Sequence, residues 1–534
     1  MRLTIVAAYL VAGCTTSGSL ELELTLPTAP DLRPAGMTTV TVLATSPDMP
    51  QTANTSLLSG NSFTAGDLPV DTNVQINVLL RDVSSRLVGV GQAPDPVDIV
   101  GNQATKVSIP VRRPFIYTSN GTNLFTFDPT LDPRDPKFQN QLSGLASPQV
   151  AVSLGGDRLV VAGPTQLQVI DTATHKVTGT PIALPAGATV ADVAAVPGTH
   201  RVAVAHSLGI SIVDIDTAMV QTAMVGAIDR VTVGPTAAGK LYAYGLVGRA
   251  SPASSALASC TGSSSLVAVS VDSPAVTSPH ALGQAVSGIA AASDRPMVFA
   301  TLPCVGQVAR IDGDPTTEIS TLMLTKISSL DNAAVLAVAG DRVLAAGTKA
   351  STAMCSGGAC GPTTKFACPE TNGNRLSFVT EGAHMIVQAI PLDASAPIVL
   401  ELPERKETMI DQGDPAMQHA QVLHSLGIVP LDMVVLPGGQ YVSIITKSTY
   451  YIERLDLTAG TTLLPCMLST TGDWLLLDLA SSSIAQRVRT QCMLTWTPAN
   501  SVFAPWSCET PSDAEKSTVG DYMPTSVGAL FGVR

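Results

Sequence analysis

Hydrophobic and polar residues alternate with a period of two along the first part of the chain. In Leu20-Glu21-Leu22-Glu23-Leu24-Thr25-Leu26 every leucine falls on one face, as in a half-buried β-strand. Four further segments repeat this pattern and are separated by turn-rich stretches: Thr38–Thr45, Val74–Leu80, Leu87–Val90 and Lys106–Val111. Several short strands within about ninety residues predict a β-sandwich domain over residues 20–112.

The run Phe63-Thr64-Ala65-Gly66-Asp67-Leu68-Pro69 lies within this region. It resembles the small immunoglobulin-like or prealbumin-like modules that occur near the start of many exported lipoproteins. The resemblance implies an immunoglobulin-like or prealbumin-like β-sandwich for this N-terminal domain.

A longer period begins after Pro114. Pairs of apolar runs recur there, and Asp128, Asp171 and Asp214, which end three of them, are spaced 43 residues apart. Arg158 and Arg201 share that spacing. Self-similarity at 40–45 residues, with several short strands in each unit, is typical of β-propeller blades.

Seven such units can be counted, and they predict an all-β chain in which residues 113–534 form a seven-bladed β-propeller with cysteine-containing insertions. The clearest unit, Gly155–Ala162 leading into Val169–Val177, resembles the YVTN-type repeat, which is close to NHL and quinoprotein-like propellers. A Gly-Asp turn joins two of its strands and an Asp-Thr turn ends the third. The Trp-Asp endings of WD40 blades are absent, and Val and Ala replace most of the tyrosine-rich strand.

The first unit starts directly at its Tyr117 strand and lacks an innermost strand of its own. The C-terminal segment Ser526–Gly532 is apolar and strand-like. Because a propeller must pair its open strand edges, we expect this segment to complete the first blade.

The N-terminus has the pattern of a bacterial export signal. Met1-Arg2 supplies one positive charge, and Leu3–Ala12 is an apolar run about half as long as a membrane-spanning helix. Val11-Ala12-Gly13-Cys14 resembles the lipobox of bacterial lipoproteins, in which the peptide is cut before the cysteine and the cysteine is acylated. The resemblance implies a signal peptide over residues 1–13 and a tether over residues 14–19, lipidated at Cys14. The alternative is a buried N-terminal strand with an incidental cysteine.

Thr15 follows the lipobox cysteine, where an aspartate would mark retention in the inner membrane of well-studied lipoproteins. By the same resemblance we expect an exported protein anchored in the cell envelope at the outer membrane, facing the periplasm or the cell surface.

Nine cysteines support export to an oxidising compartment. Lipidation of Cys14 leaves eight, an even number that allows four disulfides in any of about 105 pairings. The disulfide candidates are Cys260, Cys304, Cys355, Cys360, Cys368, Cys466, Cys492 and Cys508. Cys260 and Cys304 lie near matching hairpin positions of neighbouring units, which favours a bridge between blades. A metal or cluster site at Cys355, Cys360 and Cys368 is the competing interpretation, but no CxxC pair or nearby histidine accompanies them.

Two stretches interrupt the repeat. Residues 348–374 are rich in Gly, Ser and Thr and form either a ligand-facing loop or only a cross-linked excursion. Residues 401–426 predict a solvated connecting helix. His419 and His424 would lie on different faces of that helix, which disfavours a metal site.

Charge and motifs exclude several functions. The formal net charge of −12, without a basic stripe, argues against a nucleic-acid partner. GxSxG, HExxH, P-loop and strand-associated GxGxxG motifs are all absent, so we assign no catalytic, metal-binding or cofactor-binding residue and predict no cofactor. One set of aspartates recurs at blade turns, which favours a structural role for them: Asp128, Asp171, Asp214, Asp272, Asp312 and Asp478.

The leading hypothesis is therefore a non-catalytic binding or scaffold protein of the cell envelope. It would contact the membrane through its lipid anchor and a protein or glycan partner through a propeller face. The rival hypothesis is a lactonase-like or quinoprotein-like enzyme, which needs three or four Asp, Glu or His side chains converging on the propeller axis. A third is an accessory subunit of a secretion or surface complex.

Overall fold

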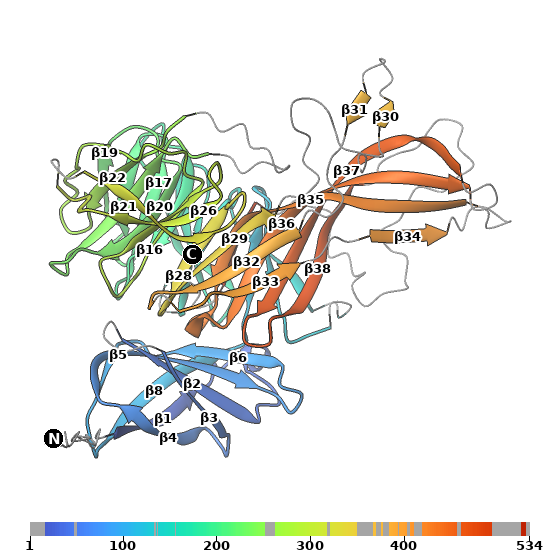
Figure 1. The fold of residues 1–534 in the computed structure, drawn as a ribbon. Helices are drawn as coiled ribbons and strands as arrows, with labels where there is room; N and C mark the ends of the chain where they lie inside the picture. Colours follow the sequence, from blue (N-terminus) through green and yellow to red (C-terminus); the bar gives the residue numbers. More distant parts are fainter. Residues whose placement is uncertain are drawn as a thin grey trace, which may run out of the picture.

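The computed structural model places the chain in two all-β parts that stack on one another (Figure 1). It describes residues 17–46, 51–132, 135, 137–154, 156–250, 262–317, 321–349, 367–369, 375–377, 384–393, 395–402, 406–410, 419–456, 461–493 and 525–529. Apart from two 3-10 turns, Pro30–Leu32 and Pro437–Gly439, every regular element in these ranges is a strand. The predicted all-β class is confirmed.

Residues 17–112, called the N-terminal module below, form one strongly curled sheet. Its strands are β1 (Ser17–Thr25), β2 (Thr39–Thr45), β3 (Thr52–Leu57), β4 (Ser62–Pro69), β5 (Asp71–Arg81), β6 (Leu87–Gln92), β7 (Val97–Ile99) and β8 (Ala104–Arg112). They pair in the order β3-β2-β5-β6-β8-β1-β4, with β7 added to β5.

The curl makes the module barrel-like and nearly closed. β6 and β8 share only the pairs Val90↔Arg112 and Gly91↔Val111, and the terminal strands β3 and β4 also touch each other. The leucines of the predicted alternating strand, Leu20, Leu22 and Leu24, point into the enclosed core and are at most 2% exposed. A β-sandwich, as predicted from the sequence, has two separate packed sheets, whereas the strands here belong to one hydrogen-bonded sheet.

The described residues from Ile116 onward form seven antiparallel blade sheets in a ring, which confirms the predicted seven-bladed propeller. Blade 1 contains β9 (Ile116–Ser119), β10 (Leu124–Phe127), β11 (Gln139–Leu142) and β39 (Ser526–Ala529). Blade 2 contains β12 (Val150–Leu154), β13 (Arg158–Ala162), β14 (Gln166–Asp171) and β15 (Lys176–Ala183). Blade 3 contains β16 (Val190–Ala195), β17 (Arg201–His206), β18 (Gly209–Asp214) and β19 (Val220–Met224). Blade 4 contains β20 (Arg230–Pro235), β21 (Leu241–Val247), β22 (Ser265–Ser270) and β23 (His280–Ala281).

The last three blades carry the irregular units. Blade 5 contains β24 (Gly288–Ala291), β25 (Val298–Leu302), β26 (Gln307–Asp312) and β27 (Met323–Ser329). Blade 6 contains β28 (Val335–Ala339), β29 (Arg342–Lys349), β32 (His384–Pro391) and β33 (Ile398–Leu402); a two-stranded hairpin, β30 (Ala367–Pro369) and β31 (Arg375–Ser377), lies between β29 and β32. Blade 7 contains β34 (Lys406–Ile410), β35 (His419–Val435), β36 (Tyr441–Asp456), β37 (Thr461–Asp478) and β38 (Ser483–Met493).

The expected closure by the C-terminal segment is confirmed. β39 is antiparallel to β9, with Gly528 opposite Tyr117, so residues 411 positions apart share blade 1. Blade 7 then packs on the completed blade 1: the Trp474 indole stacks on Phe127 with ring centroids 5.3 Å apart, and its Nε1 donates a hydrogen bond to Ser443 Oγ at 2.8 Å.

The predicted helix over residues 401–426 is wrong. Its described parts are strands: the end of β33, then β34, then the first half of β35. β35 pairs with β36 through contacts such as His424↔Tyr451. The hydrogen bonds to this later strand therefore outweigh the local helical preference of the segment.

Candidate functional site

The two faces of the propeller differ in the length of their connections. Because all blade strands are antiparallel, the first-to-second and third-to-fourth connections lie on one face and the remaining connections lie on the other. The first face, called the short-turn face, holds turns such as 196–200, 236–240 and 340–341. On the opposite face, called the insertion face, four strand pairs are joined by longer stretches that lie mostly outside the described residues: β21 to β22 by 248–264, β29 to β32 by 350–383, β33 to β35 by 403–418, and β38 to β39 by 494–525.

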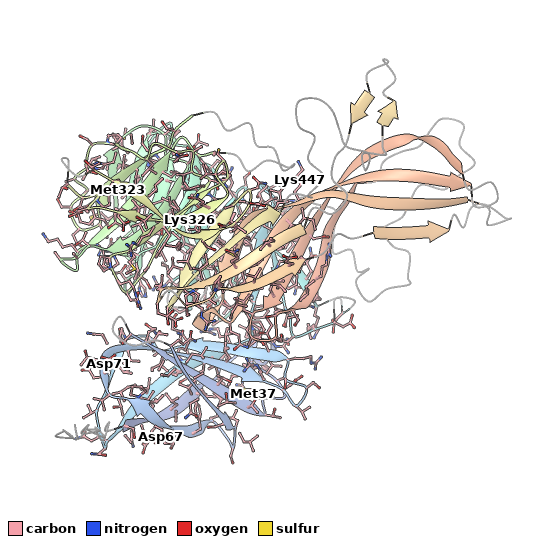
Figure 2. The ribbon with its side chains drawn as sticks, viewed as in Figure 1. Met37, Asp67, Asp71, Met323, Lys326 and Lys447 are labelled. Atoms are coloured by element: carbon pink, nitrogen blue, oxygen red, sulfur yellow. The ribbon has the colours of Figure 1, made fainter. Side chains whose placement is uncertain are left out.

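Blade 7 adds a projecting sheet to the insertion face. β35, β36 and β37 continue well beyond the blade, paired as far as His419↔Asp456 and Asp456↔Thr461. Figure 1 shows them reaching away from the ring, with β34 beside them and the β30–β31 hairpin nearby. Lys447 marks the base of this projection in Figure 2, on the opposite side of the propeller from Asp67 of the N-terminal module.

A charged cluster occupies the propeller axis. Arg230 of β20 lies 3.4 Å from Asp192 of β16 and 3.9 Å from Asp432 of β35, measured from Nη1 to the carboxylate oxygens. Blade 4 and blade 7 are on opposite sides of the ring, so the approach of Arg230 to Asp432 must cross the axis. The guanidinium therefore lies between carboxylates from different sides of the ring, at the axis where a small-molecule site of a propeller would be expected.

Both carboxylates of this cluster also join neighbouring blades. Asp192 Oδ2 accepts a hydrogen bond from Val231 N–H at 3.2 Å, linking blades 3 and 4. Asp432 Oδ2 accepts one from Val527 N–H at 3.0 Å, linking blades 7 and 1. Each aspartate is only 5% exposed, so each buried carboxylate needs compensation. Arg230 and a backbone N–H group provide it in both cases.

Hydroxyl groups make equivalent links at other blade junctions. Ser526 Oγ donates to Gln149 O at 2.6 Å, Ser287 Oγ donates to Ala333 O at 2.6 Å, and Thr348 Oγ1 donates to Ile428 O at 2.6 Å. Thr232 Oγ1 accepts from Ala291 N–H at 2.9 Å. The inner strands of adjacent blades share no ladder, so these side chains satisfy backbone groups that would otherwise be buried without partners.

The electrostatics of the cluster depend on a second arginine. Burial acts to lower the pKa of Arg230, but Asp192 and Asp432 outweigh it and raise that pKa above its ordinary value. Burial and the neighbouring Arg230 lower the pKa of Arg249 to about 10. Arg249 stays cationic at neutral pH, and its Nε donates to Ser287 O at 2.7 Å.

The recurring aspartates act mainly as turn residues, as predicted. Asp171 Oδ1 accepts from the N–H of Thr174 at 2.8 Å, and Asp214 Oδ1 accepts from the N–H of Thr217 at 2.8 Å. The hydrogen bonds that Asp214 accepts from the N–H and the hydroxyl of Thr217 lower the pKa of Asp214. Asp128 and Asp478 bind backbone N–H groups two residues on, while Asp272 and Asp312 pair with Arg201 and Arg310.

The described cysteines all belong to the insertion side of the ring. Cys304, in the β25–β26 turn, is disulfide-bonded. Cys368 is in β30, Cys466 is in the projecting part of β37, and Cys492 is near the end of β38. The remaining predicted cysteines lie outside the described residues: Cys14, Cys260, Cys355, Cys360 and Cys508.

Residues 17–19 of the predicted tether already belong to β1. Across the part of the chain that the structure describes, no helix is both long and apolar enough to cross a bilayer. The same residues contain no group of three or more His, Cys, Asp or Glu side chains placed to hold a metal ion.

The axial cluster was missed by sequence reasoning. Asp192, Arg230 and Asp432 have no common spacing and come from blades 3, 4 and 7. The one available signal was a single acid inside an apolar inner strand, as in Ala191-Asp192-Val193 and Leu431-Asp432-Met433.

Comparisons with known proteins give fold likeness only. No family model and no curated protein matches the chain. Hydrazine synthase of Kuenenia stuttgartiensis is 11% identical, with a TM-score of 0.34 over 61% of this chain and 97% of that one. The β-propeller domain of Cps50 (Swd1) from Myceliophteria thermophila is 11% identical, with a TM-score of 0.33 over 63% of this chain and 95% of that one. A chain of a nidogen/laminin complex is 7% identical, with a TM-score of 0.31 over 53% of this chain and 92% of that one.

Proposed function

We propose that this chain is a lipoprotein of the cell envelope whose propeller is a non-catalytic binding or scaffold module, and that it binds a protein partner through the insertion face. The observation that carries the proposal is the asymmetry of the ring. The projecting sheet of blade 7 extends one face, and the longest sequence separations between blade strands occur on that same face, while Arg230 reaches across the axis. A surface extended by a projecting sheet suits a macromolecule better than a small substrate.

The proposed lipoprotein has a lipid anchor, an N-terminal module and disulfides. Cys14 carries the lipid, residues 1–13 are removed, and an immunoglobulin-like or prealbumin-like module follows the anchor. Disulfides among the other eight cysteines brace the insertion face, in an oxidising compartment at the outer membrane.

The enzyme alternative has less support. A lactonase-like or quinoprotein-like site needs several ligand groups converging on the axis. The carboxylates of Asp192 and Asp432 face Arg230 at the axis, and both also accept hydrogen bonds from backbone N–H groups. Asp229 accepts the N–H of Arg249 beside them.

Site-specific photo-crosslinking in intact envelopes tests the binding face. A crosslinker at Val305, which is 44% exposed in the β25–β26 turn, samples the insertion face. A crosslinker at Ala238, exposed in the β20–β21 turn of the adjacent blade, samples the short-turn face and is the control. We expect a discrete protein adduct from position 305 and none from position 238. Equal labelling at both positions, or labelling at neither, would refute the proposed binding face.

Mass spectrometry of the mature N-terminus tests the anchor independently. The proposal expects a chain that starts at Cys14 and carries acyl groups on its thiol and amino group. An intact N-terminus with an unmodified Cys14 would remove the lipoprotein assignment and leave the crosslinking test unaffected.

A further inference from the structure

The N-terminal module packs against the short-turn face through a continuous apolar core. Leu43, Leu79 and Val90 of the module belong to the same buried cluster as Phe115 of the propeller entry and Tyr441 of blade 7. All five are at most 9% exposed. A shared core of this kind indicates a fixed interface, because separating the two parts would expose these side chains to water.

Polar contacts tie the module to three successive blades. Arg295 Nη2 of blade 5 donates to Ser46 O at 3.2 Å. Gln51 N–H donates to Asp341 Oδ2 of blade 6 at 3.3 Å, and Gln51 Nε2 donates to Gly438 O of blade 7 at 2.9 Å. Contacts spread over several blades oppose rocking about any single one.

The module and the propeller approach each other closely at the β35–β36 turn. Gly438 has a φ of 78°, and a Cβ placed there would lie 2.0 Å from Leu43 Cδ1. Beside it, the Arg81 guanidinium lies over the Tyr441 ring, 5.9 Å from its centroid. Leu43 is 4% exposed, so it has little room to move aside.

Strand directions place the start of the module away from the propeller. β1 and β8 are parallel, with Ser19 beside Ala104 and Thr25 beside Pro110. β8 ends at Arg112, where the chain enters the propeller, so Ser17 lies at the remote end of the module. Nine residues of extended strand separate these ends by about 30 Å.

From these contacts and directions we infer that the N-terminal module is a rigid pedestal. It covers blades 5, 6 and 7 on the short-turn face and turns the insertion face away from the start of β1. The orientation part rests on the proposed function: a chain anchored at Cys14 then presents its insertion face outward, with the propeller about 30 Å or more from the membrane. A module on a free linker would present all faces of the propeller in turn.

Differential scanning calorimetry of the full chain tests the rigid contact. Gly438→Ala introduces a methyl group against Leu43, and Gly239→Ala is the matched control. Gly239 has a φ of 75° in the equivalent turn of blade 4, and a Cβ there meets nothing within 4 Å. Both variants carry the same backbone penalty, but only the first disturbs the interface.

We expect the module and the propeller of the wild-type chain to melt in one transition. Gly438→Ala should separate a module transition about 4–8 °C lower, whereas Gly239→Ala should keep a single transition. Two separate transitions in the wild type, or identical behaviour of the two variants, would overturn the pedestal. Gln51→Ala, against Gln75→Ala whose bond to Ala93 O stays within the module, repeats the comparison without backbone strain.

Neutron reflectometry on a supported bilayer tests the orientation. The full lipidated chain should give a thin layer next to the lipid and a wider, propeller-sized layer beyond it. A second sample, held by a polyhistidine tag placed before Ser17 on nickel-chelating lipid, needs no native anchor. If only the tagged chain binds, the anchor proposal fails and the pedestal stands. Propeller density in contact with the lipid in the tagged sample would overturn the orientation.

Discussion

Asp432 joins the last blade to the first, because its carboxylate accepts the N–H of Val527 at 3.0 Å while it faces Arg230 across the axis. The two residues are 95 positions apart in the chain. The Asp432 side chain therefore links the last blade to the first and compensates the positive charge of Arg230 at the axis.

Asp432→Ala should lower the free energy of unfolding by about 2–4 kcal/mol. The substitution leaves the Val527 N–H without its acceptor and Arg230 with one carboxylate fewer. Asp432→Asn keeps an acceptor and removes only the charge, so its loss should be smaller. Urea denaturation followed by far-UV circular dichroism measures both.

The control for this pair is Asp272→Ala. Asp272 pairs with Arg201 at 3.1 Å, but its side chain is 73% exposed, so the change should cost less than about 1 kcal/mol. If Asp432→Ala were no worse than Asp272→Ala, the axial cluster would not stabilise the ring.

Removing residues 525–534 should lower the melting temperature by at least about 10 °C or abolish cooperative unfolding. β39 supplies the inner strand of blade 1, and Val527 and Ala529 are at most 2% exposed. A chain that ends after Ala529 keeps β39 and should melt close to the wild type. Thermal circular dichroism compares the three chains, and equal curves would contradict a stabilising role for the strand.

The part of the fold that could be predicted depends on local chemistry. Asp171 accepts a hydrogen bond from the N–H of Thr174, three residues later. Because this kind of turn recurs at a fixed interval, the blades can be predicted from the sequence. The axial cluster depends instead on three blades meeting after closure, which no spacing encodes. The incorrect helix prediction for residues 401–426 has the same cause. β35 is stabilised by pairing with β36, and β36 lies outside the short stretch of sequence from which helical propensity is judged.

His175 should make stability fall as the pH drops. Burial, with a further contribution from Arg112, lowers the pKa of His175 from 6.5 to about 4. The ring lies 4.6 Å from that of Phe115, and Nε2 is 3.3 Å from the Tyr117 hydroxyl. Between pH 6.5 and 4 the unfolded chain takes up a proton that the folded chain does not, so up to about 3 kcal/mol of stability is lost over that window.

His175→Asn isolates this effect. Position 175 has a φ of 54°, which asparagine tolerates, so the turn should persist while the titration disappears. Urea midpoints measured from pH 7 to pH 4 should fall less steeply for the variant. Equal slopes for the variant and the wild type would show that other groups dominate.

Cys304 should be linked to Cys260, bridging two neighbouring blades on the insertion face. Cys304→Ser and Cys260→Ser should each release one reactive thiol, and the double variant should release none. Thiol titration in denaturant counts them, and non-reducing peptide mapping identifies the linked pair. A thiol released elsewhere would assign Cys304 a different partner.

Since β39 comes from the very end of the described chain, blade 1 cannot receive its inner strand until residue 529 has been synthesised. The Tyr117 strand is made more than four hundred residues earlier and must wait with one edge unpaired. During that interval a nascent chain offers a template for wrong pairing and a target for chaperones or proteases. Docking of β39 onto β9 therefore requires that the chain has been made at least as far as residue 529.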